Sequence, residues 1–160
     1  ILTVSAVCFG GLLASAHQVL NSQRVHQLRN LKVVKIRANK NVIDSWVMDN
    51  DLKRQEGMMF LTDKEVKPSQ GMIFVFDLIQ ANNGRNGFWM HNTLIPLDVI
   101  YIGANHKVVN ICGGKVKDDT PLPPKGAYKY VLELRAGWAK KYGIKPGTKL
   151  DIPASVVALD

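Results

Sequence analysis

The sequence predicts a mainly β fold of the α+β class: a compact antiparallel sheet or small barrel of short strands with two short helices. Short runs rich in β-branched and aromatic residues recur along the chain, and turn-forming residues separate them. The runs do not alternate with long helices, as they would in a doubly wound parallel fold. A length of 160 residues and a hydrophobic fraction of 46% fit one folded domain.

The N-terminal segment predicts an export signal that is truncated at its front, since it has no initiator Met and no basic n-region. Residues 1–16 carry no charge, and Ala14-Ser15-Ala16 resembles a cleavage site with small residues at its outer positions. We therefore expect cleavage before His17 and a mature protein that is periplasmic or extracellular. The apolar run is shorter than the ~20 residues of a membrane-spanning helix, so we expect no stable span in the mature chain. A buried helix and an uncleaved membrane anchor are the alternatives.

The mature chain is expected to have a leader at residues 17–30, one globular domain at 31–153 and a tail at 154–160. Cys8 would leave with the signal, so Cys112 would be the only remaining cysteine and no intrachain disulfide could form.

In the first half of the domain, runs at 31–36 and 42–48 flank a turn and predict a hairpin. A short helix over 52–59 follows, with a capping oxygen offered by Asp49, Asn50 or Asp51. Gly57 falls inside it or at its end and indicates a close backbone approach. Residues 72–76 predict the next strand.

The second half is expected to hold five strands, at residues 88–90, 97–102, 107–111, 128–134 and 149–152. A helix over 136–142 should end at Gly143 in the left-handed conformation. Residues 112–127 form a long loop rich in Gly, Pro and Lys, and loops of this length tend to be functional or mobile.

Four motifs stand in order along the domain. They are residues 56–60 (EGMMF), 71–76 (GMIFVF), 88–98 (FWMHNTLIPLD), and 130–134 (YVLEL) followed by 142–147 (YGIKPG). With them the chain resembles the domain of unknown function 192 (DUF192) family of uncharacterised, often exported, bacterial and archaeal proteins. The resemblance covers about residues 31–152 and implies a compact β-rich domain without an assigned reaction. His91 stands where the family commonly has Lys or Arg.

The leading functional hypothesis is an exported binding module with a pocket around residues 89–98, beside the 112–127 loop. The candidate ligand-binding residues combine a ring, an imidazole, an amide, a hydroxyl and a carboxylate: Trp89, His91, Asn92, Thr93 and Asp98. The partner would be a small molecule or a protein. Alternatively, Asn92 and Thr93 only shape the corner before Pro96, and Asp98 only binds loop amides.

A second hypothesis is a hydrolytic or carbohydrate-active enzyme with Asp98 and Glu133 as its acid/base pair. It requires the two carboxyl groups to meet. Strand alternation places Glu133 opposite Leu132 and Leu134, either facing water or buried beside Val131. No recognisable nucleophile motif supports an enzyme, and Cys112 is expected to be an incidental thiol.

Five methionines with His17, His91, His106 and Cys112 also permit a soft-metal site, with His91 as its foremost candidate ligand. Methionines in apolar runs more often fill core gaps, and no metal-binding spacing is present. We therefore predict neither a metal nor a cofactor. The net charge is +8, but its lysines and arginines are scattered and no nucleic-acid-binding motif accompanies them, so a nucleic-acid partner is not expected.

Overall fold

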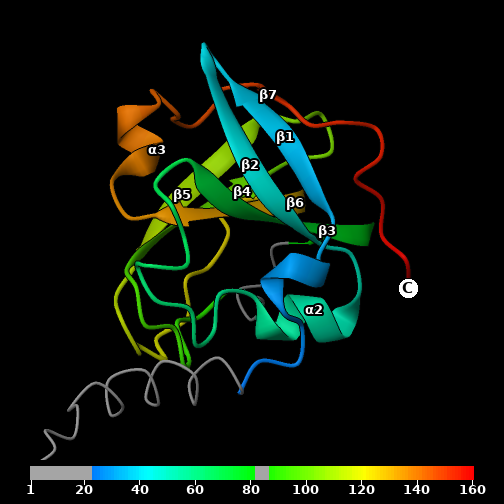
Figure 1. Cartoon of the computed structure of the whole chain (residues 1–160). Helices are drawn as coiled ribbons and strands as arrows, with labels where there is room; N and C mark the ends of the chain where they lie inside the picture. The colour runs from blue at the N-terminus through cyan, green and yellow to red at the C-terminus, as the bar shows by residue number, and fades with distance from the viewer. Residues whose placement is uncertain (1–22, 82–86) are drawn as a thin grey trace, which may run out of the picture.

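The computed structural model describes residues 23–81 and 87–160, and the predicted export signal lies outside these residues. Seven strands form one sheet that curls into a half-barrel (Figure 1). The strands are β1 (Val33–Ala38), β2 (Asn41–Met48), β3 (Gln70–Gln80), β4 (Leu97–Ile102), β5 (Val108–Gly114), β6 (Tyr128–Arg135) and β7 (Leu150–Asp151). The helices are the 3-10 turn η1 (Leu28–Asn30), α2 (Asp51–Glu56) and α3 (Trp138–Lys141). The predicted mainly β class is confirmed.

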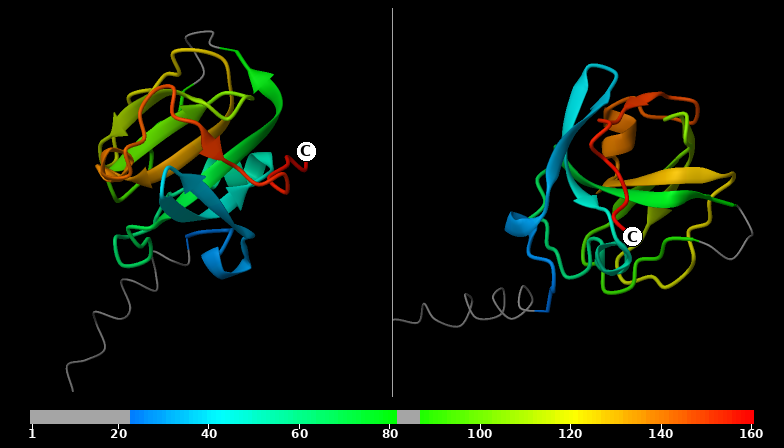
Figure 2. Two further views of the ribbon diagram at one scale, coloured as in Figure 1. Left: turned by 90° about the horizontal axis from the view of Figure 1, so that it is seen from above. Right: turned by 90° about the vertical axis from the view of Figure 1, so that its right-hand side faces the viewer.

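The strands lie in the order β5-β4-β6-β3-β2-β1-β7, and β1 and β2 form the predicted hairpin. Figure 2 shows that the sheet bends, so that this hairpin stands steeply against β3 and β6. One pair departs from the antiparallel prediction, because β2 and β3 run parallel. A parallel pair needs a crossover connection. The chain therefore passes from Met48 through α2 and an irregular segment before it re-enters the sheet at Gln70.

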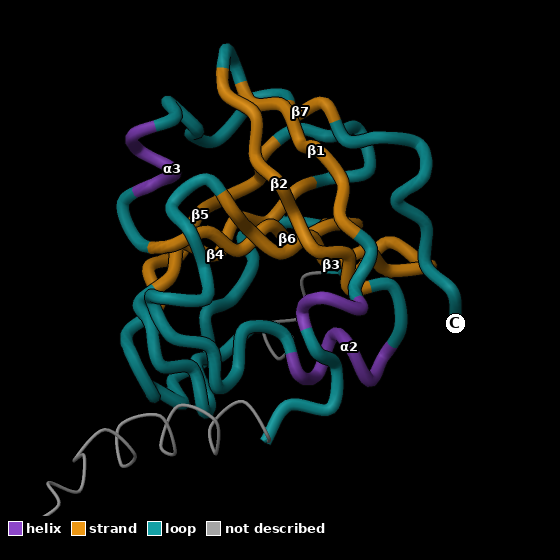
Figure 3. The backbone as a smooth tube through the Cα atoms, in the orientation of Figure 1, coloured by secondary structure: helices purple, strands orange, loops and turns teal. Residues whose placement is uncertain are grey.

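The curled sheet buries side chains on both faces. One face carries what we call the aliphatic core, which includes Ile36, Ile43, Ile73, Ile100, Leu132 and Leu134 and is closed by Ala139 of α3 and by Leu150, Ile152 and Val156. The other face carries the aromatic core, which includes Met48, Met58, Met72, Phe74, Met90, Val99, Tyr101, Tyr128 and Val131. In Figure 3 the strands occupy the upper part of the molecule, and loops and α2 fill the lower part.

The segments expected to be leader and tail contribute to the folded domain. Arg24 is buried, and its guanidinium donates hydrogen bonds to the carbonyls of Gly57 and Met59. At the other end Val156 is buried, the Leu159 amide donates to the Asp49 carbonyl at 2.7 Å, and Asp160 forms an ion pair with Arg54. Described residues of both segments therefore pack on the domain. Nothing in the sequence indicated that they would.

Two local predictions were refined by the structure. Asn50 is the cap of α2, since its Oδ1 accepts a hydrogen bond from the Lys53 amide at 3.0 Å. Gly143 has the predicted left-handed conformation, with φ of +67°.

The strand predicted at residues 88–90 is wrong. Only one isolated bridge, Phe88 to Leu122, forms there. The Met90 amide donates to the Asp118 carbonyl instead, so this segment pairs with an irregular loop rather than with a neighbouring strand. None of the helices in the described part of the chain is long and apolar enough to cross a membrane.

Candidate functional site

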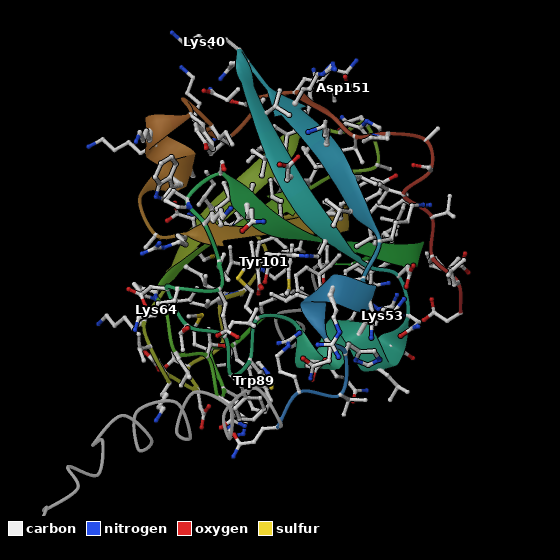
Figure 4. The ribbon with its side chains drawn as sticks, viewed as in Figure 1. Lys40, Lys53, Lys64, Trp89, Tyr101 and Asp151 are labelled. Atoms are coloured by element: carbon white, nitrogen blue, oxygen red, sulfur yellow. The ribbon has the colours of Figure 1, made fainter. Side chains whose placement is uncertain are left out.

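A pocket of about 400 Å³ opens on the side of the aromatic core, between α2, the end of β3 and the segment that follows residue 87. Its walls combine aromatic rings with charged and amide side chains: Phe74, Phe76, Phe88, Trp89 and Tyr128, with Asp51, Arg54, Gln55, Glu56, Gln80 and Glu133. Figure 4 shows Trp89 at the lower edge of the molecule and Tyr101 deeper, near the sheet. A hollow that combines ring surfaces with polar groups is a candidate ligand site.

Glu133 is the buried carboxyl of this pocket. It lies on β6 between Met72 of β3 and Val99 of β4, and only 4% of its surface is exposed. Its Oε2 has no hydrogen-bond partner among the described residues. Burial raises the pKa of Glu133 to about 8, and the positive charge of Arg24 opposes that rise. The carboxyl is therefore mostly protonated at neutral pH and lacks the partner that a buried polar group normally has.

Gly57 gives the chain room to cross over this carboxyl. It ends α2 with a φ of +45°, which favours glycine. A Cβ at this position would lie 3.1 Å from the ring of Phe74 and 3.8 Å from Oε2 of Glu133. The close backbone approach predicted for Gly57 is confirmed, and the groups it approaches belong to the pocket.

Arg24 supports the same wall from behind. Its Nη1 lies 2.9 Å from the Gly57 oxygen and 2.5 Å from the Met59 oxygen, and its Nη2 lies 3.5 Å from Oε2 of Glu56. Glu56 in turn accepts hydrogen bonds from the amides of Val25 and His26. Burial lowers the pKa of Arg24, and the negative charge of nearby carboxylates opposes that decrease. The sequence analysis did not single out Arg24, because nothing distinguishes it from Arg29 and Lys32, which also precede the first strand.

The wall opposite α2 is fixed by Tyr101. Its buried hydroxyl accepts a hydrogen bond from the Phe88 amide at 2.9 Å and donates one to the Leu122 carbonyl at 2.5 Å. Burial raises the pKa of Tyr101, so the hydroxyl keeps the proton that it donates. The ring of Phe88 stands edge-on to Phe74, with 4.8 Å between centroids. These contacts orient Phe88 inward and leave its neighbour Trp89 at the rim.

The predicted ligand-binding residues around Trp89 divide into two groups. Trp89 and Thr93 line the pocket, and Trp89 is 52% exposed and stacks on His91 at 4.9 Å. His91 and Asn92 are not among its lining residues. The Nδ1 atom of His91 lies 2.9 Å from Oδ1 of Asp119, and Asn92 turns the chain with a φ of +52°. The Thr93 hydroxyl donates to the His91 carbonyl at 3.2 Å, so the corner interpretation describes both Asn92 and Thr93, and of the predicted residues only Trp89 and Thr93 line the pocket.

Asp98 has a structural partner on the opposite face of the sheet. Its Oδ2 accepts a hydrogen bond from the Ala139 amide at 2.9 Å, in the first turn of α3. In the pairing of β4 with β6, Asp98 lies opposite Leu134 while Val99 lies opposite Glu133. Because paired residues share a face and successive residues alternate, the two carboxyl groups point to opposite sides. The structure therefore does not assemble the hypothetical acid/base pair of Asp98 and Glu133.

The soft-metal hypothesis gains no geometric support from the described residues. Met48, Met58, Met72 and Met90 are buried in the aromatic core, and no group of three or more His, Cys, Asp or Glu side chains there is arranged to hold a metal. Cys112 lies on β5, where burial raises the pKa of its thiol. Its Sγ lies 3.5 Å from the Pro123 carbonyl oxygen, so it has the environment of an unreactive thiol.

Comparison with known proteins places this chain in an uncharacterised family. The model of the DUF192 family, described as "Uncharacterized ACR", matches residues 33–152. A crystal structure of a protein of unknown function from Novosphingobium aromaticivorans DSM 12444 is similar, with 34% identity and a TM-score of 0.70 over 81% of this chain and 91% of that one.

A candidate transcription regulator from Sinorhizobium meliloti 1021 is also similar in fold. It is 24% identical, with a TM-score of 0.68 over 76% of this chain and 94% of that one. No curated protein matches the chain.

Proposed function

The chain belongs to the DUF192 family, and from this premise we propose that it is a small binding module whose ligand occupies the pocket around Glu133. The observation that carries the proposal is the buried Oε2 of Glu133, which lies at the pocket without a hydrogen-bond partner among the described residues. Leaving a buried polar group unpaired costs about 1–3 kcal/mol, and a ligand that pairs with it would recover that cost.

The contrast with Asp98 supports a binding role over a structural one. A carboxyl that only stabilises the fold would be expected to have a local partner, as Asp98 has in the Ala139 amide. Perturbed carboxyl groups beside a hollow are typical of functional sites. Trp89 adds a half-exposed ring at the pocket rim, a position in which a ligand can bury it.

A second hollow of about 590 Å³ continues from the pocket past Trp89. Both hollows share Gln55, Glu56, Met59 and Trp89, and the second adds the exposed side chains of Val25 and Leu52. A ligand longer than the pocket would therefore extend along this apolar side, which leaves room for either a small molecule or a segment of a protein.

The proposal is tested by a thermal-shift ligand screen on wild type, Trp89→Ala and Glu133→Gln. Trp138→Ala is the matched control, because Trp138 packs against the aliphatic core on the other side of the sheet. We expect compounds that raise the melting temperature of the wild type and of Trp138→Ala but not of the two pocket variants. Ligands that stabilise all four proteins equally would overturn the assignment of the site.

We also propose that the protein works outside the cytoplasm, because residues 1–16 have the composition of an export signal. Expression of the chain, followed by cell fractionation and N-terminal sequencing, tests this. A mature protein that begins at His17 in the periplasm or medium is the expected result. An uncleaved protein in the cytoplasm is the contrary one.

A further inference from the structure

The unpaired oxygen of Glu133 favours a ligand that donates a hydrogen bond to a carboxylate. Oε2 of Glu133 is buried and has no partner among the described residues, and it lies 3.8 Å from the point where a Cβ of residue 57 would stand. The Gly57 backbone therefore passes close to this oxygen, and both residues line the pocket. The strongest hydrogen bond that a ligand can offer to a carboxylate comes from a charged donor.

The charges around the pocket also favour a cation. The carboxylates of Asp51 and Glu56 line the pocket, and Asp160 forms an ion pair with its lining residue Arg54. The guanidinium groups of Arg24 and Arg54 are the positive charges paired with these three carboxylates. His26 contacts Glu56, and Glu65 acts on Arg24. The local charge is therefore negative even before Glu133 ionises, although the whole chain has a net charge of +8. Opposite charge of this kind attracts a cationic ligand and disfavours an anion.

The rings of the walls suit the organic part of such a ligand. Phe74, Phe88, Tyr101 and Tyr128 form one series of edge-to-face contacts in that order, and Trp89 offers an exposed ring at the rim. The guanidinium of Arg54 already lies 5.1 Å from the centroid of Phe76, which shows that this wall accommodates a cation against a ring. Aromatic faces attract ammonium and guanidinium groups as well as apolar surface.

We infer that the pocket binds an organic amine in its ammonium form, with the cationic head donating to Glu133 and the carbon skeleton packed on the aromatic walls. This inference rests on the proposed binding function and names the class of its ligand. The bound pair has a carboxylate and an ammonium group, so a protonated Glu133 must release its proton to solvent when the amine binds.

Proton release gives the inference a measurable signature. Burial raises the pKa of Glu133 to about 8, so below that pH the ammonium must displace a proton, and binding of one ligand then releases one proton. The affinity should rise about tenfold per pH unit from pH 6 to pH 7.5 and level off above pH 8. The other charged and titratable groups that line the pocket or act on Glu133 are Asp51, Glu56, Arg24, Arg54, Tyr101 and Tyr128, and His26 contacts Glu56.

The experiment uses three probes on one skeleton: 2-phenylethylamine, its neutral counterpart 2-phenylethanol and the anion 3-phenylpropionate. Their dissociation constants for the purified protein are measured by NMR titration between pH 6 and pH 9, where the alkylammonium stays protonated. We expect the amine to bind at least about tenfold more tightly than the alcohol at pH 8. Glu133→Gln should abolish the pH dependence of amine binding and change alcohol binding by less than about twofold.

The outcomes separate the inference from the proposed function. If the alcohol or the anion binds as tightly as the amine, or if amine affinity does not change with pH, the pocket binds ligands but the cationic class is overturned. If none of the three probes perturbs the resonances of the pocket residues in the wild type, both the inference and the proposed pocket function are overturned. Asp98→Asn is the control for a carboxyl change on the other face and should bind the amine as the wild type does.

Discussion

The aliphatic and aromatic cores lie on two faces of one sheet, yet they are covered in different ways. On the aliphatic face, α3 and the C-terminal segment close over branched side chains, and the nearby carboxylate of Asp98 has the Ala139 amide as its partner. On the aromatic face, the crossover from β2 to β3 and the segments near Phe88 and Leu122 provide the cover. That cover leaves a hollow and the carboxyl of Glu133 without a partner among the described residues.

The difference shows how this fold separates stability from binding. Both faces draw on the same strands, since Leu132 and Glu133 are neighbours on β6. The aliphatic face satisfies its polar groups internally, so it stabilises the fold. On the aromatic face, irregular segments cover the sheet incompletely. The hollow that remains is a site that a ligand can fill. Substitutions on the two faces should therefore have separable effects on stability and on ligand response.

The largest effect is expected from the aliphatic core. Leu132 is fully buried there, and Leu132→Ala should lower the free energy of unfolding by about 3 kcal/mol, because it removes buried methyl groups and leaves a cavity. Urea denaturation measures the loss, and the variant should keep the ligand response of the wild type. Met72→Ala, on the other face beside Glu133, is the matched variant and should change both. A Leu132→Ala variant that loses ligand response while folded would contradict the separation of the two faces.

A smaller loss is expected when the support behind the pocket is removed. Arg24→Ala should lower the free energy of unfolding by about 2 kcal/mol, because the Gly57 and Met59 carbonyls and Glu56 lose a buried charged partner. Arg24→Lys is the control for charge, since one ammonium cannot reproduce the fork of a guanidinium. Hydrogen exchange should accelerate at residues 57–61 in both variants. Unchanged stability and exchange would show that the segment before β1 does not support the site.

Glu133 should make the folded protein less stable as pH rises. In the folded protein its pKa is raised to about 8, whereas the unfolded value is near 4.5. Between these values the unfolded chain has lost the proton that the folded chain still holds, so the wild type loses stability as pH rises. Glu133→Gln lacks this loss. Its stability relative to wild type should grow by about 1–3 kcal/mol between pH 5 and pH 8, then level off.

Thermal denaturation across pH 5 to 9 measures this difference. A difference between wild type and Glu133→Gln that stays constant over the whole range would show that the carboxyl is ionised or well solvated in the folded protein, and it would weaken the argument for the pocket.

The smallest effect is expected at Asp98. Asp98→Ala removes the acceptor of the Ala139 amide in the first turn of α3 and should cost about 1 kcal/mol, the usual value of a helix cap. Amide exchange in α3 should increase while the ligand response of the pocket stays unchanged. Loss of ligand binding in this variant would show that Asp98 contributes to the candidate site. It would contradict the assignment of binding to the aromatic face alone.

Much of the fold was predictable because it depends on local chemistry. The β1–β2 hairpin, the strand at 97–102 and the left-handed Gly143 follow from side-chain pattern and turn residues within a few positions. The error at residues 88–90 has the opposite cause. Its apolar composition resembles a strand, but the Tyr101 hydroxyl and the 115–122 loop take its backbone hydrogen bonds, and these partners are remote in sequence.

The candidate site was predictable only in part. Trp89 and Thr93 could be selected from the motif at 88–98, and Glu133 could be noted as a carboxyl within an apolar strand. Its burial could not be inferred, because alternation assigns a residue to a face of the sheet and does not say what covers that face. Arg24 was missed for the same reason, since its partners lie 33 and 35 residues away.

By itself, the sequence determined the β-rich class, most of the strand positions, the family resemblance and the composition of the N-terminal segment. Only the tertiary structure decided that Asp98 and Glu133 face opposite ways, that Arg24 belongs to the domain, and that the β2–β3 crossover leaves a hollow over Glu133. The physical reason is that strands and turns arise from neighbours along the chain. The environment of a buried carboxyl arises instead from segments that meet only when the sheet has curled and its cover is in place.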